Sequence, residues 1–153
     1  MSERILFTAN FRKMTLADIP AIAALEAETF SDAWTSQSIY ETFCQKQAFI
    51  IVAEVNGQVA GYSIVYYVMD EGEIARIAVG NQFRRRGIGC GLLNYTGECC
   101  KEKQVERLLL DVRESNETAR AFYRKYGFAE DGIRKHFYDK PSEDAVLMSK
   151  ALS

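Results

Sequence analysis

The 153-residue sequence predicts an α/β (α+β) fold built on a mixed, mostly antiparallel sheet. Two neighbouring apolar segments, 48–55 and 58–69, flank Asn56-Gly57, a dipeptide that favours the tight turn of a β-hairpin because both residues readily adopt positive φ. Further along, a strand, a helix and a strand follow one another over residues 73–112. This order predicts two neighbouring parallel strands joined by a right-handed crossover.

The N-terminal part of the chain is predicted to form a strand and two helices before the hairpin begins. Alternating apolar residues indicate the strand, and the first helix is indicated by a capping box of Thr15 and Asp18 followed by Pro20. The elements expected there are a half-buried strand over 5–11, a helix from Thr15 to Phe30, and a short helix from Thr35 or Ser36 to a point before Ala48.

The C-terminal half is predicted to supply the remaining elements. Asp70-Glu71-Gly72 is expected to turn the chain into its next strand, and Ser115 or Asn116 to cap a helix that ends at Gly127. The expected elements are a strand over 73–79, a polar loop over 80–86, a helix over 87–104, a strand over 105–112, a helix over 115–127, and an antiparallel pair over 128–138 and 144–152. About seven strands and about four helices are therefore expected, in a single domain over residues 1–153.

Composition excludes several classes of protein. The 19 lysines and arginines nearly balance 21 aspartates and glutamates, which leaves no general attraction for nucleic acid or anionic lipid. No run approaches the roughly 20 apolar residues of a membrane span, and no signal peptide is recognisable. The four cysteines match neither a zinc pattern nor a disulfide framework. We expect a cytoplasmic monomer with reduced thiols and no metal, and neither nucleic acid nor a membrane as partner.

The loop from Arg84 to Gly91 carries the strongest functional signal. It joins a predicted strand to a predicted helix and contains three consecutive arginines and three glycines. Glycines in this position let backbone N–H groups close around an anion, and the helix N-terminus adds about half a positive charge. The loop lacks the lysine of a Walker motif and the glycine spacing of a Rossmann motif. It is predicted to bind a pyrophosphate, the alternative being a tight turn beside solvated arginines.

Two motifs resemble those of the GNAT superfamily of acetyltransferases. They are Ile77-Ala78-Val79 followed by Arg84-x-x-Gly87-x-Gly89, and Leu110-Asp111-Val112-Arg113-x-Ser115-Asn116 followed by Ala121-Phe122-Tyr123-x-x-x-Gly127-Phe128. Further matches are Trp34, the segment 134–138 and Glu143-Asp144-Ala145. Over nearly its whole length the chain is similar to the RimI-like subfamily, whose bacterial members acetylate the N-terminal alanine of a small-subunit ribosomal protein. The resemblance implies acetyl-CoA as co-substrate and the N-terminal peptide of a ribosomal protein as acceptor.

The resemblance also implies a role for each residue of the site. Tyr123 corresponds to the general acid that returns a proton to the thiolate, and Asp111 to the general base. Cofactor contacts are implied for Ile77, Ala78 and Val79 along the pantetheine arm, for Arg84, Arg85, Arg86, Gly87, Ile88, Gly89 and Cys90 around the pyrophosphate, and for Asn116. Acceptor contacts are expected from Trp34, Glu73, Arg76 and Tyr138.

Some of these residues also fit purely structural roles. Tyr123 lies in an apolar helical stripe, Asn116 is a good helix cap, and Trp34 suits a core anchor as well as a peptide groove. Two positions depart from the family pattern. Asp111 stands where well-known members carry glutamate, which leaves the base open between Asp111 and Glu73. Arg76 stands where close relatives commonly carry asparagine, which leaves the peptide specificity open.

The predicted chemistry is direct attack of a neutral amine on the acetyl thioester. The sequence offers no cysteine in an activating arrangement with histidine and a carboxylate, so an acyl-enzyme lacks its nucleophile. An α-amine, with a pKa near 7.7 to 8.0 against about 10.4 for lysine, is neutral at pH 7 roughly 300 times more often. An α-amine acceptor therefore needs only a modest base. The alternatives are a small-molecule amine or an internal lysine as acceptor, or a catalytically silent acyl-CoA-binding regulator.

Overall fold

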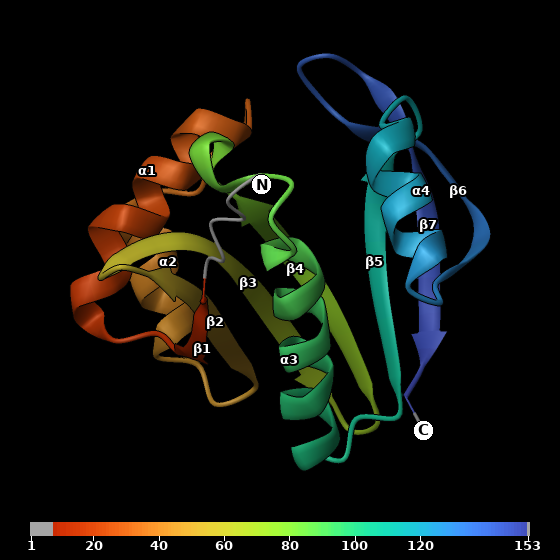
Figure 1. The fold of residues 1–153 in the computed structure, drawn as a ribbon. Helices are drawn as coiled ribbons and strands as arrows, with labels where there is room; N and C mark the ends of the chain where they lie inside the picture. The colour runs from red at the N-terminus through yellow and green to blue at the C-terminus, as the bar shows by residue number, and fades with distance from the viewer. Residues whose placement is uncertain (1–7, 153) are drawn as a thin grey trace, which may run out of the picture.

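The computed structural model describes residues 8–152, which form one seven-stranded sheet with helices on both faces (Figure 1). The strands are β1 Asn10–Lys13, β2 Ala48–Val55, β3 Gln58–Val68, β4 Glu71–Val79, β5 Arg107–Arg113, β6 Ala129–Tyr138 and β7 Glu143–Ala151. The α-helices are α1 Ile19–Thr29, α2 Ser36–Phe43, α3 Ile88–Glu102 and α4 Glu117–Lys125, with short 3-10 helices at Leu16–Asp18 and Asn81–Phe83. The predicted fold class, with its seven strands and four helices, is confirmed.

The sheet divides into two arms between β4 and β5. The strand order is β1-β2-β3-β4-β5-β7-β6, and every neighbouring pair is antiparallel except β4 and β5. These two parallel strands share only three register pairs, the last of which joins Glu73 to Leu109. Beyond this pair β4 continues to Val79 and β5 to Arg113 without pairing to each other, and Figure 1 shows the two strands diverging.

A β-bulge at Ala75 changes which side chains at the end of β4 point to each face of the sheet. Ile64 on β3 pairs with Arg76 and Val65 pairs with Ile74, so Ala75 has no partner. Because a bulge adds one residue to the alternation, Glu73 and Arg76 point to the same face of the sheet although three positions separate them. The sequence pattern did not predict this bulge.

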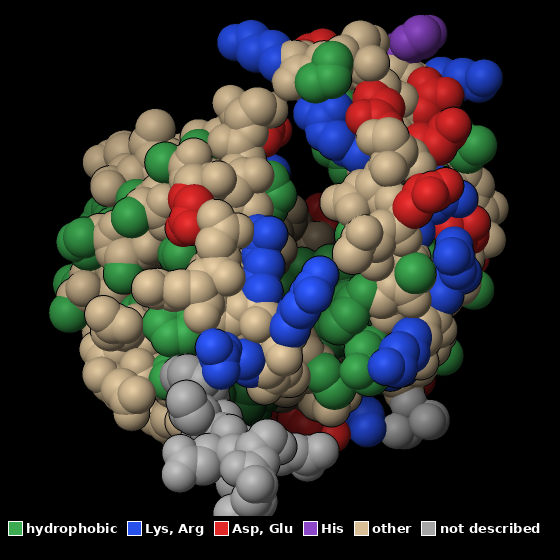
Figure 2. All heavy atoms as spheres, turned by 45° about the horizontal axis from the view of Figure 1, so that its top comes forward, with side chains coloured by type: hydrophobic (Ala, Val, Ile, Leu, Met, Phe, Trp, Pro, Cys, Tyr) green, Lys and Arg blue, Asp and Glu red, His purple; other side chains and the backbone are tan. Residues whose placement is uncertain are grey.

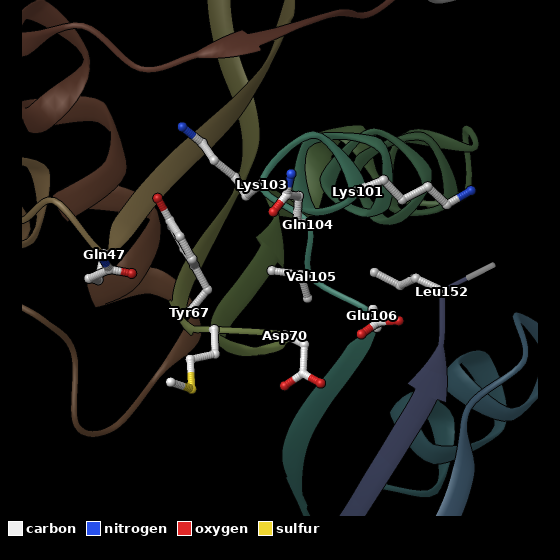
Figure 3. Close-up of a pocket in the computed structure, with 10 residues that line it drawn as sticks. Gln47, Tyr67, Asp70, Lys101, Lys103, Gln104, Val105, Glu106 and Leu152 are labelled. Atoms are coloured by element: carbon white, nitrogen blue, oxygen red, sulfur yellow. The ribbon is translucent and has the colours of Figure 1, made fainter.

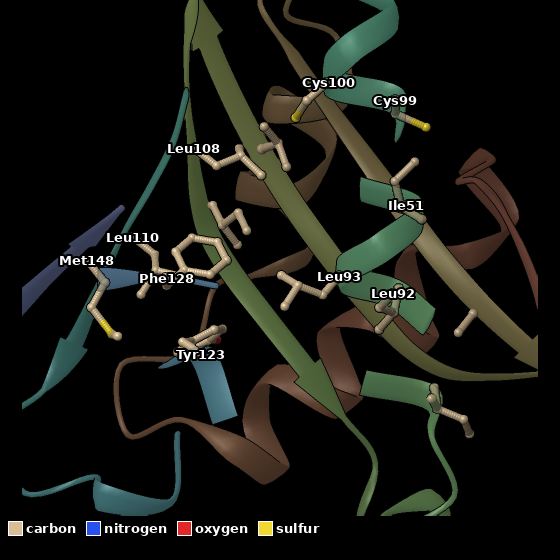
Figure 4. Packing of buried hydrophobic residues seen from close by; sticks show 14 of the residues in the cluster. Ile51, Leu92, Leu93, Cys99, Cys100, Leu108, Leu110, Tyr123, Phe128 and Met148 are labelled. Carbon is tan, nitrogen blue, oxygen red and sulfur yellow. The ribbon is translucent and has the colours of Figure 1, made fainter. Parts of the chain in front are cut away.

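Two apolar clusters hold the helices on the sheet. One joins α3 and α4 to one face, and Figure 4 shows part of it, including Leu92, Leu108 and Phe128. Cys99 and Cys100 are buried in this cluster, as expected of cysteines with packing roles. The other cluster joins α1 and α2 to the opposite face and contains Ile22, Ile39, Tyr62 and Ile64. The two faces of the sheet therefore have different helical neighbours.

The local turn and cap signals are confirmed. The β2–β3 hairpin turns at Asn56 and Gly57, with φ of 50° and 78°. The Asp18 carboxylate accepts the Thr15 N–H at 2.7 Å, which is one half of the predicted capping box. The last two strands form the predicted antiparallel pair.

Several details of the predicted elements differ from the structure. Residues 5–7 of the first expected strand lie outside the described residues, and the described strand begins only at Asn10. The turn before β4 lies at Met69–Asp70, because Glu71 and Gly72 pair with strands on both sides and so belong to the sheet. The loop 80–86 is not wholly polar, since Phe83 is buried. Within residues 8–152, no helix is long and apolar enough to cross a membrane.

Candidate active site

The divergence of β4 and β5 opens a hollow between the two arms of the sheet. Figure 2 shows this hollow, with lysine and arginine side chains gathered along its near edge. One edge of β4 is paired with β3 as far as Val79, whereas the edge facing β5 is unpaired beyond Glu73. The backbone of Ile77, Ala78 and Val79 therefore presents a free strand edge to the hollow, as an extended ligand that adds to a sheet would require.

The N-terminus of α3 lies at the end of the loop that follows β4. Gly87 precedes the helix with a φ of 78°, and Gly91 donates the first helical hydrogen bond to its carbonyl at 3.0 Å. The amides of Ile88, Gly89 and Cys90 consequently have no acceptor within the helix. A Cβ added at Gly87 would meet nothing within 4 Å. These amides, the helix dipole and the open space suit a pyrophosphate.

The three glycines of the loop have different functions. Gly87 alone among them has a positive φ. A Cβ at Gly89 would lie 3.5 Å from the Phe122 ring, an ordinary contact, so backbone strain does not explain this glycine. A Cβ at Gly91 would lie 2.3 Å from the Phe11 ring, so Gly91 allows α3 to pack closely against β1. The pyrophosphate prediction therefore depends most on Gly87.

The arginines of the loop are exposed beside this helix terminus. Arg84 Nε donates to the Val79 carbonyl at 3.2 Å, which ties the loop to the end of β4. Arg85 adopts a left-handed conformation with a φ of 63°, which turns the chain before Gly87. The predicted contacts of Arg84, Arg85 and Arg86 with phosphate remain predictions.

Two carboxylates lie on one face of the sheet where the arms begin to diverge. On β5, Leu110 and Val112 are buried on the α3–α4 side, so alternation turns Asp111 to the opposite face. Glu73 pairs with Leu109, which shares the face of Asp111. Asp111 and Glu73 are therefore neighbours at the base of the hollow, and both remain candidates for the general base.

The environment raises the pKa of both carboxyl groups. Desolvation by burial raises the pKa of Asp111, while the positive charge of Arg134 on β6 opposes the shift. Desolvation likewise raises the pKa of Glu73, the charge of Asp111 raises it further, and Arg134 again opposes the rise. A carboxylate with a raised pKa is a stronger proton acceptor. Arg134 was not among the predicted site residues, because its proximity arises from pairing across β5, β7 and β6.

Tyr123 lies on the other face of the sheet, in the cluster between α4 and the sheet. Its ring makes edge contacts with Phe122 and Phe128, and its hydroxyl makes no hydrogen bond within residues 8–152. Burial raises the pKa of Tyr123, so the hydroxyl keeps its proton at neutral pH. The candidate acid and the candidate base thus approach the hollow from opposite faces.

Tyr138, at the end of β6, is close to the face of the sheet that carries Asp111 and Glu73, which we call the carboxylate face. Burial, followed by the charge of Asp111, raises the pKa of Tyr138 to about 12. The guanidinium of Arg113 stacks on its ring, 4.4 Å from the centroid. Tyr138 is therefore an uncharged wall of the hollow at neutral pH.

Trp34 and Asn116 have structural partners. Trp34 packs against the α1–α2 cluster, and its ring centroid lies 6.4 Å from that of Tyr66, which pairs with Glu73 in the sheet. Asn116 accepts the Ala119 N–H at 3.1 Å and so caps α4. The expected cap is confirmed, whereas the expected contacts of Trp34 with the acceptor and of Asn116 with the cofactor remain predictions.

A second hollow, of about 770 Å³, lies at the other end of α3 (Figure 3). It is lined by Tyr67, Asp70 and Lys103, among others, and by none of the predicted site residues. The 15 residues of α3 separate it from the N-terminus of the helix. At 1.5 Å per residue this is about 22 Å, too far for the two hollows to form one site.

Comparison with known proteins identifies the family. Residues 19–128 match the acetyltransferase (GNAT) family, and the chain belongs to this family. GNAT acetyltransferases use acetyl-CoA as co-substrate.

Several similar proteins have more specific names than the family. A Bacillus subtilis (strain 168) protein, described as a candidate ribosomal protein bS18-alanine N-acetyltransferase, is 38% identical over 92% of this chain and 93% of its own length. The ribosomal protein bS18-alanine N-acetyltransferase of Escherichia coli (strain K12) is 30% identical over 89% of this chain and 93% of its own. The crystal structure of the E. coli ribosomal-protein-S18-alanine N-acetyltransferase matches with a TM-score of 0.88 and 28% identity, over 95% of both chains.

Proposed function

We propose that this chain transfers the acetyl group of acetyl-CoA to the α-amine of an N-terminal alanine on a small-subunit ribosomal protein. The relatives named for bS18 support this acceptor. The structural observation that carries the proposal is the divergence of β4 and β5, which lets groups from both faces of the sheet reach one hollow. The α3 terminus offers an anion site on one side, and Asp111 and Glu73 offer a base on the other.

The residues around the hollow fit acetyl-CoA. The amides of Ile88, Gly89 and Cys90 would hold the pyrophosphate, and the open space at Gly87 leaves room for it. The free edge of β4 would hold the pantetheine arm by backbone hydrogen bonds. When bound, acetyl-CoA supplies an activated acyl group.

The side chains then need only to position the amine and to move two protons. Asp111, directly or through a water, removes a proton from the amine, with Glu73 as the alternative base. Tyr123, protonated because burial raises its pKa, donates a proton to the departing sulfur. Attack is direct, and no acyl-enzyme is formed.

The acceptor can be tested with three matched substrates. We expect the purified chain to acetylate a peptide that starts with alanine, and not the same peptide with a blocked N-terminus and an internal lysine, nor a small polyamine. Mass spectrometry locates the acetyl group, and ribosomal proteins from a strain lacking the gene should lose acetylation at one N-terminus. Transfer to lysine or polyamine would favour another acceptor. Acetyl-CoA binding without transfer to any amine would favour a silent regulator.

Changes at Asp111 should identify the base. We expect Asp111→Asn to lower kcat/KM most at low pH, where more of the amine still carries its proton, and higher pH to rescue it partly. Asp111→Glu should retain or improve activity, because one more methylene extends the carboxylate by on the order of 1 Å. These expectations are checked by pH–rate profiles with an alanine-starting peptide, using Glu73→Gln as the matched variant. A full rate for Asp111→Asn across the profile would assign the base to Glu73 or to water.

The charged carboxylates of Asp111 and Glu73 should lower the stability of the folded chain at neutral pH. Because the folded chain raises the pKa of Asp111 and of Glu73, it binds their protons more tightly than the unfolded chain does. Their charged forms therefore oppose folding, and this effect grows as the pH rises above about 4. We expect Asp111→Asn and Glu73→Gln to unfold at higher temperature than the wild type at pH 7, with the difference shrinking at pH 3. Lower melting temperatures at pH 7 would contradict this electrostatic assignment.

A further inference from the structure

Arg76 is enclosed in a network that joins β4 to residues 30–34, which we call the α1–α2 segment. Its side chain is only 11% exposed. Its Nε lies 3.3 Å from Glu26 Oε1, an ion pair without hydrogen-bond alignment, and its Nη2 donates to the carbonyl of Asp32 at 2.7 Å and to its carboxylate at 3.1 Å. The guanidinium also stacks on Phe30, 4.2 Å from the ring centroid. Arg76 is thus held on several sides by the chain itself.

Glu26, the partner of Arg76 on α1, is fully buried. Its carboxylate accepts hydrogen bonds from the backbone N–H of Trp34, at 2.9 Å, and from the hydroxyl of Tyr62. A buried carboxylate is costly unless a positive charge accompanies it. Arg76 supplies that charge, so one arginine both neutralises Glu26 and binds the segment that Glu26 holds through Trp34.

The α1–α2 segment borders the face that carries the candidate bases. The Trp34 ring lies beside Tyr66, whose partner in the sheet is Glu73. Ser31 Oγ donates to the carbonyl of Lys140 at 3.1 Å, so the segment is bonded to the turn between β6 and β7. This contact joins the two arms of the sheet.

The other end of that contact is also held by an arginine. Arg113 on β5 donates to the carbonyls of Asp139 and Pro141, both at 2.9 Å, and its Nη1 lies 3.4 Å from the Glu143 carboxylate. Each of the two diverging strands therefore carries one arginine that fixes one loop: Arg76 on β4 fixes the α1–α2 segment, and Arg113 on β5 fixes the β6–β7 turn.

We propose that Arg76 is a positioning residue that fixes the α1–α2 segment as one wall of the acceptor site, without itself touching the acceptor. The proposal rests on the proposed function, because it takes the carboxylate face as the acceptor side. It replaces the expected direct contact, since the guanidinium is engaged by Glu26, Asp32 and Phe30 and exposes little surface. Loosening the segment should therefore weaken acceptor binding and spare acetyl-CoA, which the α3 terminus holds.

The test uses Trp34, the only tryptophan of the chain, as a reporter within the segment. Arg76→Lys keeps a positive charge near Glu26 but lacks the fork of donors that reaches Asp32 as well. We expect acrylamide quenching of Trp34 in the protein without substrates to rise about twofold. Because a hydrogen bond between charged groups is lost, the KM for an alanine-starting peptide should rise on the order of tenfold. The kcat and the KM for acetyl-CoA should stay within about twofold of wild type.

Arg107→Lys is the matched control. Arg107 lies half-exposed at the start of β5, where its guanidinium donates to Ser149 Oγ and forms an ion pair with Asp131, so this change should alter none of the four quantities. If Arg76→Lys does not fold, the double variant Arg76→Met with Glu26→Gln removes both charges and leaves no buried ion unpaired. It should show the same rise in quenching and in acceptor KM.

The outcomes separate the proposal from its alternatives. A higher acceptor KM with unchanged Trp34 quenching would mean that Arg76 contacts the acceptor directly. Higher quenching with an unchanged acceptor KM would mean that the segment is not a wall of the acceptor site. Either result would overturn the proposal. A wild-type chain that acetylates no peptide N-terminus would instead overturn the proposed function. The quenching of Trp34 would still show whether Arg76 fixes the α1–α2 segment.

Discussion

Replacing Tyr123 with phenylalanine is expected to lower kcat by a factor of roughly 10² to 10⁴ and to leave acetyl-CoA affinity nearly unchanged. The change removes one hydroxyl, while the ring keeps its contacts with Phe122 and Phe128. Because this hydroxyl makes no hydrogen bond within residues 8–152, its loss leaves no protein group without a partner. The effect should therefore fall on the departure of the thiolate and not on folding.

Three measurements on the Tyr123→Phe variant check this expectation. Steady-state kinetics gives kcat, calorimetry gives the affinity for acetyl-CoA, and thermal unfolding gives the stability. Tyr67→Phe is the matched control, because its hydroxyl bonds the Lys46 carbonyl at the hollow beyond the far end of α3. It should keep the wild-type rate. A Tyr123→Phe variant with near wild-type turnover would remove Tyr123 from the mechanism and leave it as a core residue.

Replacing Gly87 with valine is expected to weaken acetyl-CoA binding by roughly a factor of 100 or more. The φ of 78° at this position disfavours any side chain, and the space into which a Cβ would project is the space that a pyrophosphate at the α3 terminus requires. The backbone would shift, the side chain would occupy the site, or both. Either result separates the helix amides from the anion.

Gly57 provides a control for backbone strain. It has the same φ of 78° and the same open surroundings, but lies in the β2–β3 turn. Gly57→Val should therefore lower stability about as much as Gly87→Val and leave acetyl-CoA affinity intact. Calorimetry on both folded variants decides the matter. Wild-type affinity in Gly87→Val would place the pyrophosphate elsewhere. An equal loss of affinity in Gly57→Val would attribute the loss to backbone strain and not to a blocked site. Gly89→Val is a weaker test, because its side chain would press mainly on Phe122.

The local chemistry of the sequence determined much of the fold. Asn56-Gly57 predicted the hairpin because these residues adopt positive φ at little cost. The caps were predictable because the Asp18 carboxylate accepts the Thr15 N–H and the Asn116 side chain accepts the Ala119 N–H. The strand-helix-strand order around α3 predicted the parallel pair. In each case the partners are close in sequence or follow from connectivity.

The orientation of the site residues was decided by contacts between distant segments. The bulge at Ala75 depends on the register with β3, and it places Arg76 on the face of Glu73. Without it, alternation would have turned the two residues apart. The early end of β4–β5 pairing likewise depends on both strands, and no local pattern marks it.

The sequence by itself determined the elements, the anion-binding loop and the residues that resemble a GNAT site. Only the tertiary structure decided that Gly91 serves packing against Phe11, that Asp111 and Glu73 share one environment, and that Arg76 is bound to Glu26 and Asp32. The physical reason is that caps and turns depend on backbone preferences a few residues long. Burial, charge pairing and the facing of a side chain depend instead on segments that meet only when the sheet assembles.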